Sequence, residues 1–311
     1  MPKNLKQLSE SPMRLTGGHR LCPGCGEPIA VRQILAASAD PVIAANATGC
    51  LEVSTTIFPY TAWNIPWLHI AFENAAAVAA GMEAMYQSLK NQGQIDADTN
   101  YNFVAFAGDG GTYDIGFQSL SGAVERGHKF LYVCLNNQAY MNTGIQRSSA
   151  SPMGANTTTS PAGKVLPGKT MHQKDLTACM AAHDMPYVAQ SIPGRWRDLT
   201  RKAERAFEID GPSFINVLTP CPLGWRCAPE ETVSISQLAA DTCFWPLYEV
   251  DHGEWKLTYK PKEKLPVDEF LSKQGRFRHL FKGDTGERVR KEIQEHVDLK
   301  WEQLLERCGE A

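Results

Sequence analysis

The chain has 311 residues, of which 43% are hydrophobic and 21% are charged, and these fractions are typical of globular proteins rather than disordered or fibrous ones. Lys and Arg number 31 and Asp and Glu number 34, so the net charge of −3 provides no basic field for nucleic acid or an anionic membrane. The chain has no apolar run of the roughly 18 residues needed to span a membrane, and its first residues lack the apolar core of a secretory signal. We therefore expect a cytoplasmic protein with no nucleic-acid or membrane partner.

Helical and strand patterns alternate along most of the chain. Helical periodicity occurs over residues 28–39, 73–90, 115–127, 173–183 and 196–209. Short apolar runs of strand type occur at residues 42–46, 103–107, 130–136, 187–190 and 214–218. The continuously apolar character of some of these runs is expected of parallel strands that are covered on both faces. This order predicts an α/β fold with a doubly wound, mostly parallel sheet.

Three segments depart from this alternation. Residues 141–169 have almost no apolar periodicity and are rich in Gly, Ser, Thr and Pro, which predicts a long functional or disordered loop. Residues 241–259 predict a hairpin-like arm, and residues 287–308 predict a helix that docks on its own domain or on a partner. The apolar residues near one face of that helix are Val289, Ile293, Val297, Trp301 and Leu304. We divide the chain into a main domain at residues 1–227 and a C-terminal arm and helix at residues 228–311, where we expect subunit contacts.

Nine cysteines are many for a chain in a reducing compartment. We therefore expect some of them to bind a metal or a cluster rather than to form disulfides. Cys22 and Cys25 form a CxxC pair in LCPGCGEP, whose Pro and Gly bend the backbone so that both thiolates can reach one metal. No strand precedes the pair, which disfavours thioredoxin-type chemistry. Taken alone, the pair fits zinc, an iron–sulfur cluster or no metal.

Two further cysteines follow predicted strands. Cys50 comes after the strand at 42–46 and Cys221 after the strand at 214–218, so both fall at the carboxyl edge of the sheet, where such folds bind ligands. By number, four thiolates fit tetrahedral zinc and a 4Fe–4S cluster equally well. The wide separation of the cysteines disfavours a self-contained zinc ribbon, and Cys227 is the alternative to Cys221 as the fourth ligand.

A glycine-rich turn follows the strand predicted at 103–107. It consists of Gly108, Asp109, Gly110 and Gly111 and precedes a predicted helix. Glycines let backbone N–H groups approach phosphate oxygens, and the start of a helix favours an anion. The carboxylate in this turn is a hard oxygen ligand suited to an Mg²⁺ ion that bridges a diphosphate.

Asn137 strengthens the interpretation of this turn, because GDGG alone is a weak signal. It follows Asp109 by one helix and one strand, so both side chains are expected at the same edge of the sheet. The backbone carbonyl of Ala139 supplies a possible third oxygen. Together these groups predict a site for Mg²⁺ and a diphosphate.

Taken together, the motifs resemble those of the β subunits of 2-oxoacid:ferredoxin oxidoreductases, the family that includes pyruvate:ferredoxin and oxalate oxidoreductases. The matching segments are HRLCPGCGEP, NATGCLE, HIAFENAAAVAAG, FAGDGGTYDIG, AYMNTGIQRSSASP, NTTTSP and TPCPLGW. The similarity extends from about His19 to the GRFRHL segment near residue 280 and covers most of the chain. The GDGG turn with its asparagine resembles the Mg²⁺ and diphosphate motif of thiamine-diphosphate enzymes.

The resemblance implies a catalytic subunit that binds thiamine diphosphate, Mg²⁺ and one 4Fe–4S cluster. It implies oxidative decarboxylation of a 2-oxoacid, with electrons passed through the cluster to ferredoxin. By position, the implied cluster ligands are Cys22, Cys25, Cys50 and Cys221. The implied Mg²⁺ ligands are Asp109, Asn137 and the carbonyl of Ala139. The implied contacts with the organic cofactor are Gly49, His69, Gly108, Asp109, Gly110, Gly111, Asn137, Asn142 and Thr143. Asn142 is also the implied catalytic residue, facing the substrate.

The resemblance leaves the substrate open and implies partners. Family members that use pyruvate carry YGAW where this chain has MGAN at residues 153–156, so we consider both pyruvate and oxalate. The implied partners are α-, γ- and δ-type subunits, which supply a glutamate beside the pyrimidine ring and further clusters. We therefore expect the chain to be catalytically incomplete alone. Two other functions use some of the same motifs: a zinc-stabilised nucleotide-binding module and a subunit of a non-oxidative thiamine decarboxylase.

Several polar residues have two interpretations. Glu73 and Asn74 fit a helix cap as well as a cofactor contact. His69 fits a core histidine as well as a neighbour of the diphosphate. Arg147 and Lys164 in the long loop fit either an anion contact or simple solvation.

Overall fold

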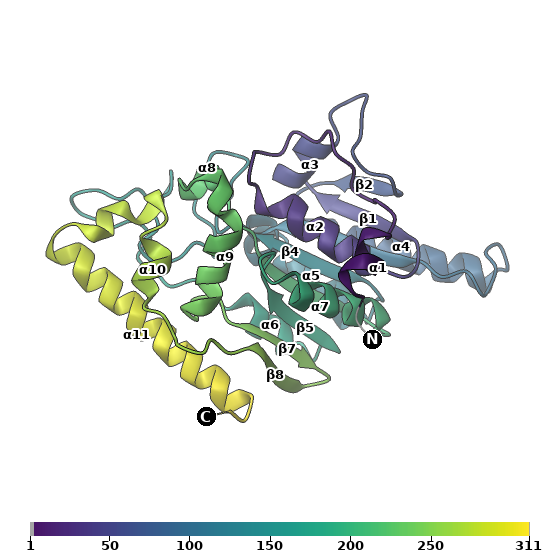
Figure 1. The fold of residues 1–311 in the computed structure, drawn as a ribbon. Coiled ribbons are helices and arrows are strands. Elements are labelled where there is room, and N and C mark those ends of the chain that lie inside the picture. The colour runs from purple at the N-terminus through teal and green to yellow at the C-terminus, as the bar shows by residue number, and fades with distance from the viewer. Residues whose placement is uncertain (1–2, 311) are drawn as a thin grey trace.

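The computed structural model describes residues 3–310, which form one eight-stranded sheet of order β2-β1-β3-β4-β6-β5-β7-β8 (Figure 1). The strands are β1 (Val42–Ala47), β2 (Trp67–Ile70), β3 (Asn102–Gly108), β4 (Leu131–Asn136), β5 (Tyr187–Ser191), β6 (Ser213–Leu218), β7 (Leu247–Asp251) and β8 (Glu254–Tyr259). Strands β1 to β6 pair in parallel, whereas β7 pairs antiparallel with both β5 and β8. The predicted mostly parallel sheet is confirmed.

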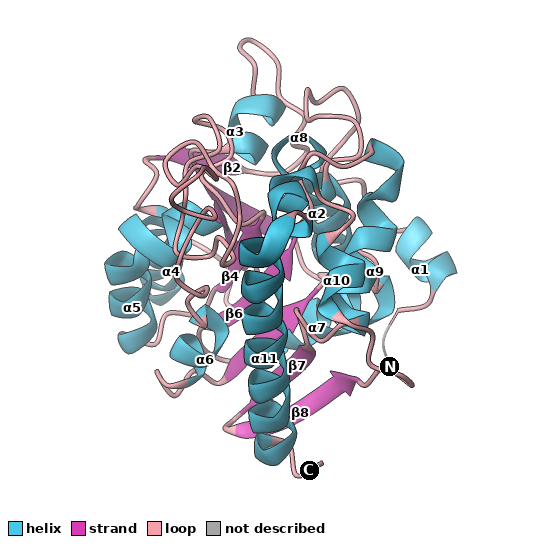
Figure 2. Cartoon of the chain, turned by 90° about the vertical axis from the view of Figure 1, so that its left-hand side faces the viewer, coloured by secondary structure: helices cyan, strands magenta, loops and turns pink. Residues whose placement is uncertain are grey.

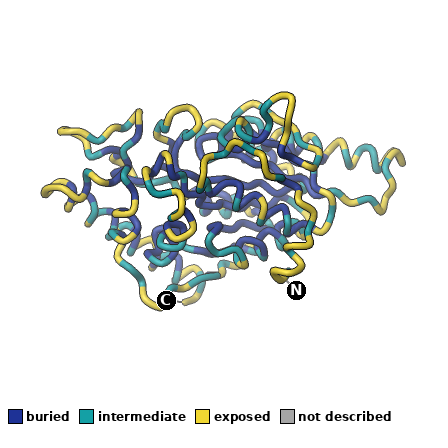
Figure 3. The backbone as a smooth tube through the Cα atoms, turned by 45° about the horizontal axis from the view of Figure 1, so that its top comes forward, coloured by how far each residue is buried: buried dark blue, intermediate teal, exposed yellow. Residues whose placement is uncertain are grey.

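Helices cover both faces of the sheet and create two apolar cores. Helices α2 (Gly26–Ala37) and α7 (Trp196–Glu208) contact each other over one core. The other core is covered by α4 (Ala75–Asn91), α5 (Phe117–Glu125), α6 (Leu176–Ala181), α9 (Thr232–Asp241), α10 (Val267–Leu271) and α11 (Gly283–Arg307). The central strands are buried between these layers (Figure 3). This is the doubly wound arrangement that the alternating pattern predicted.

Small residues bring helix α4 close to the sheet. The alanines on its buried face are Ala75, Ala76, Ala79 and Ala80. Their spacing places them on one side of the helix, and α4 contacts β1 and β3. The predicted strand at 103–107 is likewise rich in alanine, and β3 is buried over nearly its whole length. These small side chains let α4 pack closely against β1 and β3.

Three short elements follow β1, β3 and β6 at the edge of the sheet where the parallel strands end. Helices α3 (Cys50–Thr55) and α8 (Pro222–Trp225) follow β1 and β6 and occupy the upper rim in Figures 1 and 2. A π-helical turn at Gly110–Ile115 follows β3 and precedes α5. The remaining short elements are α1 (Leu5–Ser9) and the 3₁₀ segments Pro229–Glu231 and Gly275–Phe281.

The predicted hairpin extends the sheet rather than projecting from it. Strand β7 pairs with β5 through Tyr187 and Asp251, and β8 forms the outer edge. Helix α11 then lies against the body of the molecule (Figure 2). All five apolar residues predicted for its inner face are buried: Val289, Ile293, Val297, Trp301 and Leu304. The helix therefore docks on its own chain, and the boundary between residues 227 and 228 stays a prediction.

The predicted long loop is ordered by internal contacts. No helix or strand lies between β4 and α6 in this described part of the chain. The ammonium group of Lys169 is buried and donates to the carbonyl of Ser151 at 2.5 Å and to that of Ser149 at 3.3 Å. Met153 and Ala155 join the apolar core. The sequence predicted either a functional or a disordered loop, and these buried contacts argue against disorder.

Candidate functional site

Four neighbouring strands deliver the predicted site residues to one edge of the sheet. Strands β1, β3, β4 and β6 are adjacent and parallel, so their carboxyl ends lie side by side. Cys50 follows β1, Asp109 follows β3, Asn137 follows β4 and Cys221 follows β6. Ligands of doubly wound folds bind at this edge.

All four predicted cluster ligands line one cavity of about 170 Å³: Cys22, Cys25, Cys50 and Cys221. The loop with the first two is held against the end of β6, because the Gly26 N–H donates to the Pro220 carbonyl at 3.1 Å. Within this loop the Cys25 N–H donates to the Cys22 carbonyl at 3.0 Å, closing the turn between the two thiols. Cys227 does not line this cavity, so it is not the fourth member of the group.

These thiols affect one another electrostatically. Burial raises the pKa of Cys25 and Cys50 far above the usual value, and the nearby Glu27 raises both further. Burial also raises the pKa of Cys221 to about 11. Other cysteines of the group also raise the pKa of each of these three thiols, as expected of side chains that face a common space. In type and number, these four thiols from three separate segments match the ligand set of a 4Fe–4S cluster.

A second cavity of about 290 Å³ adjoins the first. Of the predicted cofactor contacts, Gly49, Gly108, Gly110, Asn137, Asn142 and Thr143 line it, together with Ala139. Five residues line both cavities: Glu27, Cys50, Asn137, Met141 and Asn142. The proposed catalytic residue Asn142 therefore borders the cysteine group as well as the glycine-rich turn.

The remaining predicted contacts lie next to this second cavity. Asp109 and Gly111 are fully buried beneath it. His69 is exposed on β2, so the core interpretation of this histidine is wrong. Its Nε2 lies 2.8 Å from the Thr48 hydroxyl, and Thr48 lines the cavity. Gly110 allows a close approach, because a Cβ there would lie 2.4 Å from the ring of Tyr140.

Two of the predicted Mg²⁺ ligands have an oxygen without a hydrogen-bond partner. Among the described residues, Oδ1 of Asp109 and Oδ1 of Asn137 are both buried and unpaired. The other Asp109 oxygen accepts from Ser148 Oγ at 2.5 Å, and Asn137 Nδ2 donates to Glu27 Oε1 at 3.0 Å. Burial raises the pKa of Asp109 to about 7. Buried oxygens that lack donors fit a hard cation such as Mg²⁺. Within residues 3–310, no group of three or more His, Cys, Asp and Glu side chains is arranged to hold a metal ion.

Glu27 is a site residue that the sequence analysis did not single out. It is only 4% exposed and lines both cavities. Burial raises the pKa of its carboxyl group to about 7, and its Oε2 has no hydrogen-bond partner in the described chain. The sequence feature that could have indicated Glu27 as a site residue is its position two residues after Cys25 in LCPGCGEP.

Other polar residues that had two interpretations lie outside both cavities. Asn74 occupies the cap position of α4 but makes no side-chain cap hydrogen bond. Arg147 and Lys164 are exposed and line neither cavity. Asn156, the last residue of the MGAN segment that left the substrate open, also lines neither cavity. Its Oδ1 accepts from the Ala162 N–H at 3.0 Å within the long loop. Within residues 3–310, no helix combines the length and apolar character needed to cross a membrane.

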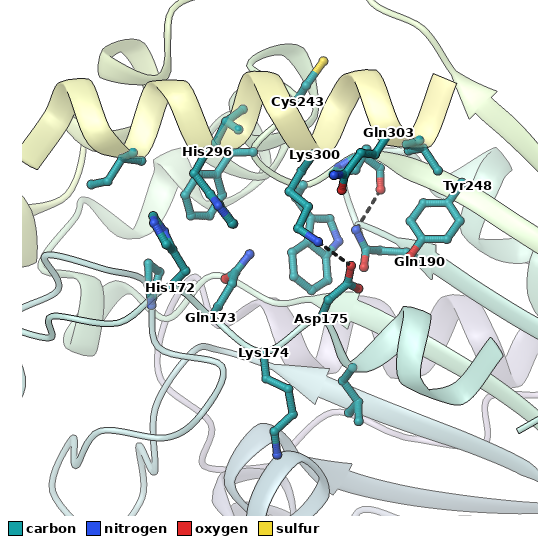
Figure 4. Close-up of a pocket in the computed structure, with 18 of the residues that line it drawn as sticks. His172, Gln173, Lys174, Asp175, Gln190, Cys243, Tyr248, His296, Lys300 and Gln303 are labelled. Carbon is teal, nitrogen blue, oxygen red and sulfur yellow. Dashed lines mark hydrogen bonds and ion pairs between the residues drawn. The ribbon is translucent and has the colours of Figure 1, made fainter. Parts of the chain in front are cut away.

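A separate cavity of about 110 Å³ lies between α11 and the segment before α6 (Figure 4). Lys300 on α11 faces Asp175 with 3.8 Å between Nζ and Oδ2. His172 and His296 stack with their ring centroids 3.7 Å apart. This cavity shares no lining residue with the two at the carboxyl edge of the sheet.

Comparisons with known proteins agree with the motifs. The model of the family "Thiamine pyrophosphate enzyme, C-terminal TPP binding domain" matches residues 47–217. The pyruvate synthase subunit PorB of Thermotoga maritima is 50% identical over 313 residues, covering 98% of this chain and 96% of that protein. PorB of Methanocaldococcus jannaschii is 51% identical over 282 residues, covering 91% and 94%.

A solved structure supports the fold independently. The 2-oxoglutarate:ferredoxin oxidoreductase from Magnetococcus marinus superposes with a TM-score of 0.56 at 20% identity, covering 75% of this chain and 82% of that one. Relatives at about half identity over nearly the whole chain establish the family that the motifs predicted. The chain therefore belongs to the thiamine pyrophosphate enzymes and is a β subunit of the 2-oxoacid:ferredoxin oxidoreductase family of oxidoreductases.

Proposed function

We propose that this chain is the catalytic subunit of an enzyme that oxidatively decarboxylates pyruvate with thiamine diphosphate and Mg²⁺ and passes the electrons through one 4Fe–4S cluster to ferredoxin. The observation that supports this most directly is the shared wall of the two cavities. Cys50, Asn137 and Asn142 border both of them. A redox centre in one cavity would thus lie beside an organic cofactor in the other, as electron transfer between them requires.

The glycine-rich turn and the loop after β4 would hold the diphosphate and its cation. Asp109 and Asn137 each present a buried unpaired oxygen, and Ala139 lines the second cavity together with Asn137. Backbone N–H groups at Gly110 and Gly111 would approach the phosphate oxygens, and Gly49, Thr143 and His69 would surround the rest of the cofactor. When bound, thiamine diphosphate supplies the carbanion chemistry that decarboxylation of a 2-oxoacid needs.

Cysteines and polar residues around the shared wall would complete the reaction centre. Cys22, Cys25, Cys50 and Cys221 would ligate the cluster. Burial raises the pKa of Cys25, Cys50 and Cys221, so these three thiols are protonated at neutral pH before ligation. They would release their protons on ligation, because thiolates are the binding form.

Asn142 would orient the substrate, because this residue lines both cavities. Pyruvate is the favoured substrate, since the two PorB relatives are named pyruvate synthase subunits. Those relatives are named as subunits, and we propose that other subunits of the same complex supply the glutamate beside the pyrimidine ring and the onward path to ferredoxin.

Replacement of Cys50 by Ser in the assembled complex tests the cluster assignment. We expect Cys50→Ser to lower the iron and acid-labile sulfide content by one cluster and to abolish ferredoxin reduction, while thiamine diphosphate still binds. Cys227→Ser is the matched control, because Cys227 is partly buried near α8 but outside the cavity. Unchanged iron in Cys50→Ser would overturn the assignment, and one equivalent of zinc in place of iron would favour the nucleotide-binding module.

The substrate is tested with the unmodified complex. Reduction of methyl viologen is measured with pyruvate, other 2-oxoacids and oxalate, each with and without coenzyme A. We expect the highest kcat/KM with pyruvate in the presence of coenzyme A. Faster turnover of oxalate without coenzyme A would show the proposed substrate to be wrong while leaving the cofactor assignments intact.

A further inference from the structure

Arg276, in the GRFRHL segment, is a buried cation that the proposed function does not use. It is 3% exposed and lies in the 3₁₀ segment Gly275–Phe281. Its guanidinium donates to Gln274 Oε1 at 2.9 and 2.7 Å and to Gln138 Oε1 at 2.5 Å. These acceptors are neutral amides, and within residues 3–310 Arg276 forms no ion pair with a carboxylate. A buried charge without a counter-charge is costly, so a role for its charge is expected.

The guanidinium lies between the two loops of the proposed site. Its Cζ is 4.1 Å from the centroid of the Trp225 ring, and Trp225 ends the helix that begins after Cys221. Trp225 in turn donates from Nε1 to the Asn137 carbonyl at 2.8 Å. The Gln138 side chain that accepts from Arg276 belongs to the same loop as Asn137. Arg276 therefore contacts one residue from the cysteine side and one from the cation side.

The backbone around Arg276 holds this position. The Gly275 N–H donates to the Arg226 carbonyl at 3.2 Å, and a Cβ on Gly275 would lie 2.7 Å from the Arg226 Cβ. The segment is thus in direct contact with the end of α8. The nearby groups that carry a negative charge when ionised are Cys221, Cys227 and Asp109. Although burial lowers the pKa of Arg276 to about 9, the group stays protonated at neutral pH.

We propose that Arg276 supplies the positive charge that offsets the negative charge of the thiolate-bound cluster and thereby raises its reduction potential. This inference rests on the proposed function. Reduction adds one electron to a centre that is already anionic, without a proton, and the electron comes from the 2-oxoacid in turnover. A fixed positive charge in a low-dielectric interior stabilises the reduced form more than the oxidised form. Net charge and nearby charges are among the properties that set the potential of such clusters.

Redox titration of the purified complex with dithionite, followed by electron paramagnetic resonance, tests this role. The signal to follow is the one that is absent from the Cys50→Ser complex. Arg276→Gln removes the charge, and Gln274→Glu neutralises it while the guanidinium stays packed on Trp225. At the midpoint of the unmodified complex, we expect each variant to lower the ratio of reduced to oxidised cluster about tenfold, which is about 59 mV for a one-electron couple.

Two controls separate charge from packing. Arg278→Gln removes the same charge from an exposed position on the same 3₁₀ segment and should leave the midpoint unchanged. Arg276→Lys keeps the charge and should stay near the unmodified midpoint. Iron content and circular dichroism show which variants fold and assemble the cluster. If Arg276→Gln does not assemble it, Gln274→Glu decides, because that variant retains Arg276.

The outcomes distinguish this inference from the proposed function. An unmodified complex without the cluster signal would overturn both. A normal signal with an unchanged midpoint in Gln274→Glu and Arg276→Gln would overturn only the role of Arg276. Loss of the cluster in both Arg276→Lys and Arg276→Gln, with an unchanged midpoint in Gln274→Glu, would indicate a purely structural role and would also overturn it.

Discussion

At the scale of single residues, Asp109 combines complete burial with an oxygen that has no hydrogen-bond partner. Its position at the end of β3 makes it part of the sheet edge, and Ser148 from the long loop holds its other oxygen. The energetic cost of burying this carboxylate raises its pKa to about 7. A bound cation would offset that cost, since it stabilises the ionised form.

Replacement of Asp109 by Asn keeps the shape of the side chain and removes its charge. We expect Asp109→Asn to weaken Mg²⁺-dependent binding of thiamine diphosphate roughly tenfold or more, which is about 1.4 kcal/mol. Isothermal titration calorimetry with the assembled complex measures this. Asp210→Asn is the control, because the Asp210 side chain is 98% exposed. Native affinity and native Mg²⁺ dependence in Asp109→Asn would contradict the ligand assignment.

The sequence motifs indicated Asp109 and Asn137 because both follow strands in one α/β pattern, whereas Glu27 was overlooked for a physical reason. An acidic residue in the first turn of a helix is common, since it interacts favourably with the helix dipole. Only the folded chain shows that this carboxylate is buried and bonded to Asn137 from a distant loop. Arg276 was overlooked for a similar reason, because its neighbours Trp225 and Gln138 come from other segments.

At the scale of elements, helix α11 is held by one apolar stripe and by contacts around the cavity in Figure 4. The stripe positions are three or four residues apart, so they form a single face along the helix. Trp301 is among the buried residues of that face, whereas Leu299 on the same helix is 52% exposed. Docking of α11 therefore depends on a few large side chains.

Truncation of Trp301 should loosen this docking. We expect Trp301→Ala to lower the free energy of unfolding by about 3 kcal/mol, because it removes a large side chain from a packed core. Leu299→Ala, measured in parallel by chemical denaturation, should change the stability by less than about 0.5 kcal/mol. Equal effects of the two substitutions would show that the stripe does not hold the helix.

The stacked histidines predict a pH dependence of stability. Burial, together with the nearby His172 and Lys300, lowers the pKa of His296 to about 4, while Asp175 acts in the opposite direction. Burial also lowers the pKa of His172, with Glu292 opposing and Lys169 adding to the shift. An unfolded histidine has a pKa of about 6.5, so below that pH the unfolded chain binds more protons than the folded one. Stability should therefore fall as the pH drops from about 6.5 toward 4.

The thermal unfolding midpoint of the chain and of His296→Gln tests this dependence. We expect the unmodified chain to lose more stability than the variant between about pH 7 and about pH 5, with a smaller difference at higher pH. Identical pH profiles would show that the histidine pair does not contribute.

Element prediction succeeded for the buried strands and failed for elements that depend on tertiary contacts. Strand β2 has only four residues, and two of them are exposed, so it lacks a clear apolar pattern. It exists because it pairs with β1, with Ala44 opposite Trp67. Helix α3 is short and contains β-branched residues, and its cap residue is Gly49, which has no side chain to cap the helix. Neither element has a local signal strong enough to be predicted.

At the scale of the whole molecule, strand order determines which loops meet. The order β1-β3-β4-β6 places two cysteine segments on either side of the two segments with Asp109 and Asn137. The alternating pattern predicted that these residues share an edge, but it could not give their order along that edge. That order depends on crossovers between strands that are distant in sequence.

The other subunits are needed for turnover if the pyrimidine-side glutamate lies outside this chain. We expect the purified chain alone to show no pyruvate-dependent reduction of methyl viologen, and addition of the partner subunits to restore it. The control is the complex assembled from co-expressed subunits. Turnover by the isolated chain at the rate of the complex would contradict the proposed division of the active site.

The hydrogen bond between the Gly26 N–H and the Pro220 carbonyl has a consequence for biosynthesis. It joins the CxxC loop, near the N-terminus, to the end of β6, which is among the last strands of the parallel sheet to leave the ribosome. Chains leave the ribosome with the N-terminal part first. The loop with Cys22 and Cys25 therefore cannot make its contact with the end of β6 until most of the polypeptide has been made. If these thiols ligate the proposed cluster, its full ligand set is complete only after the chain has been made as far as Cys221.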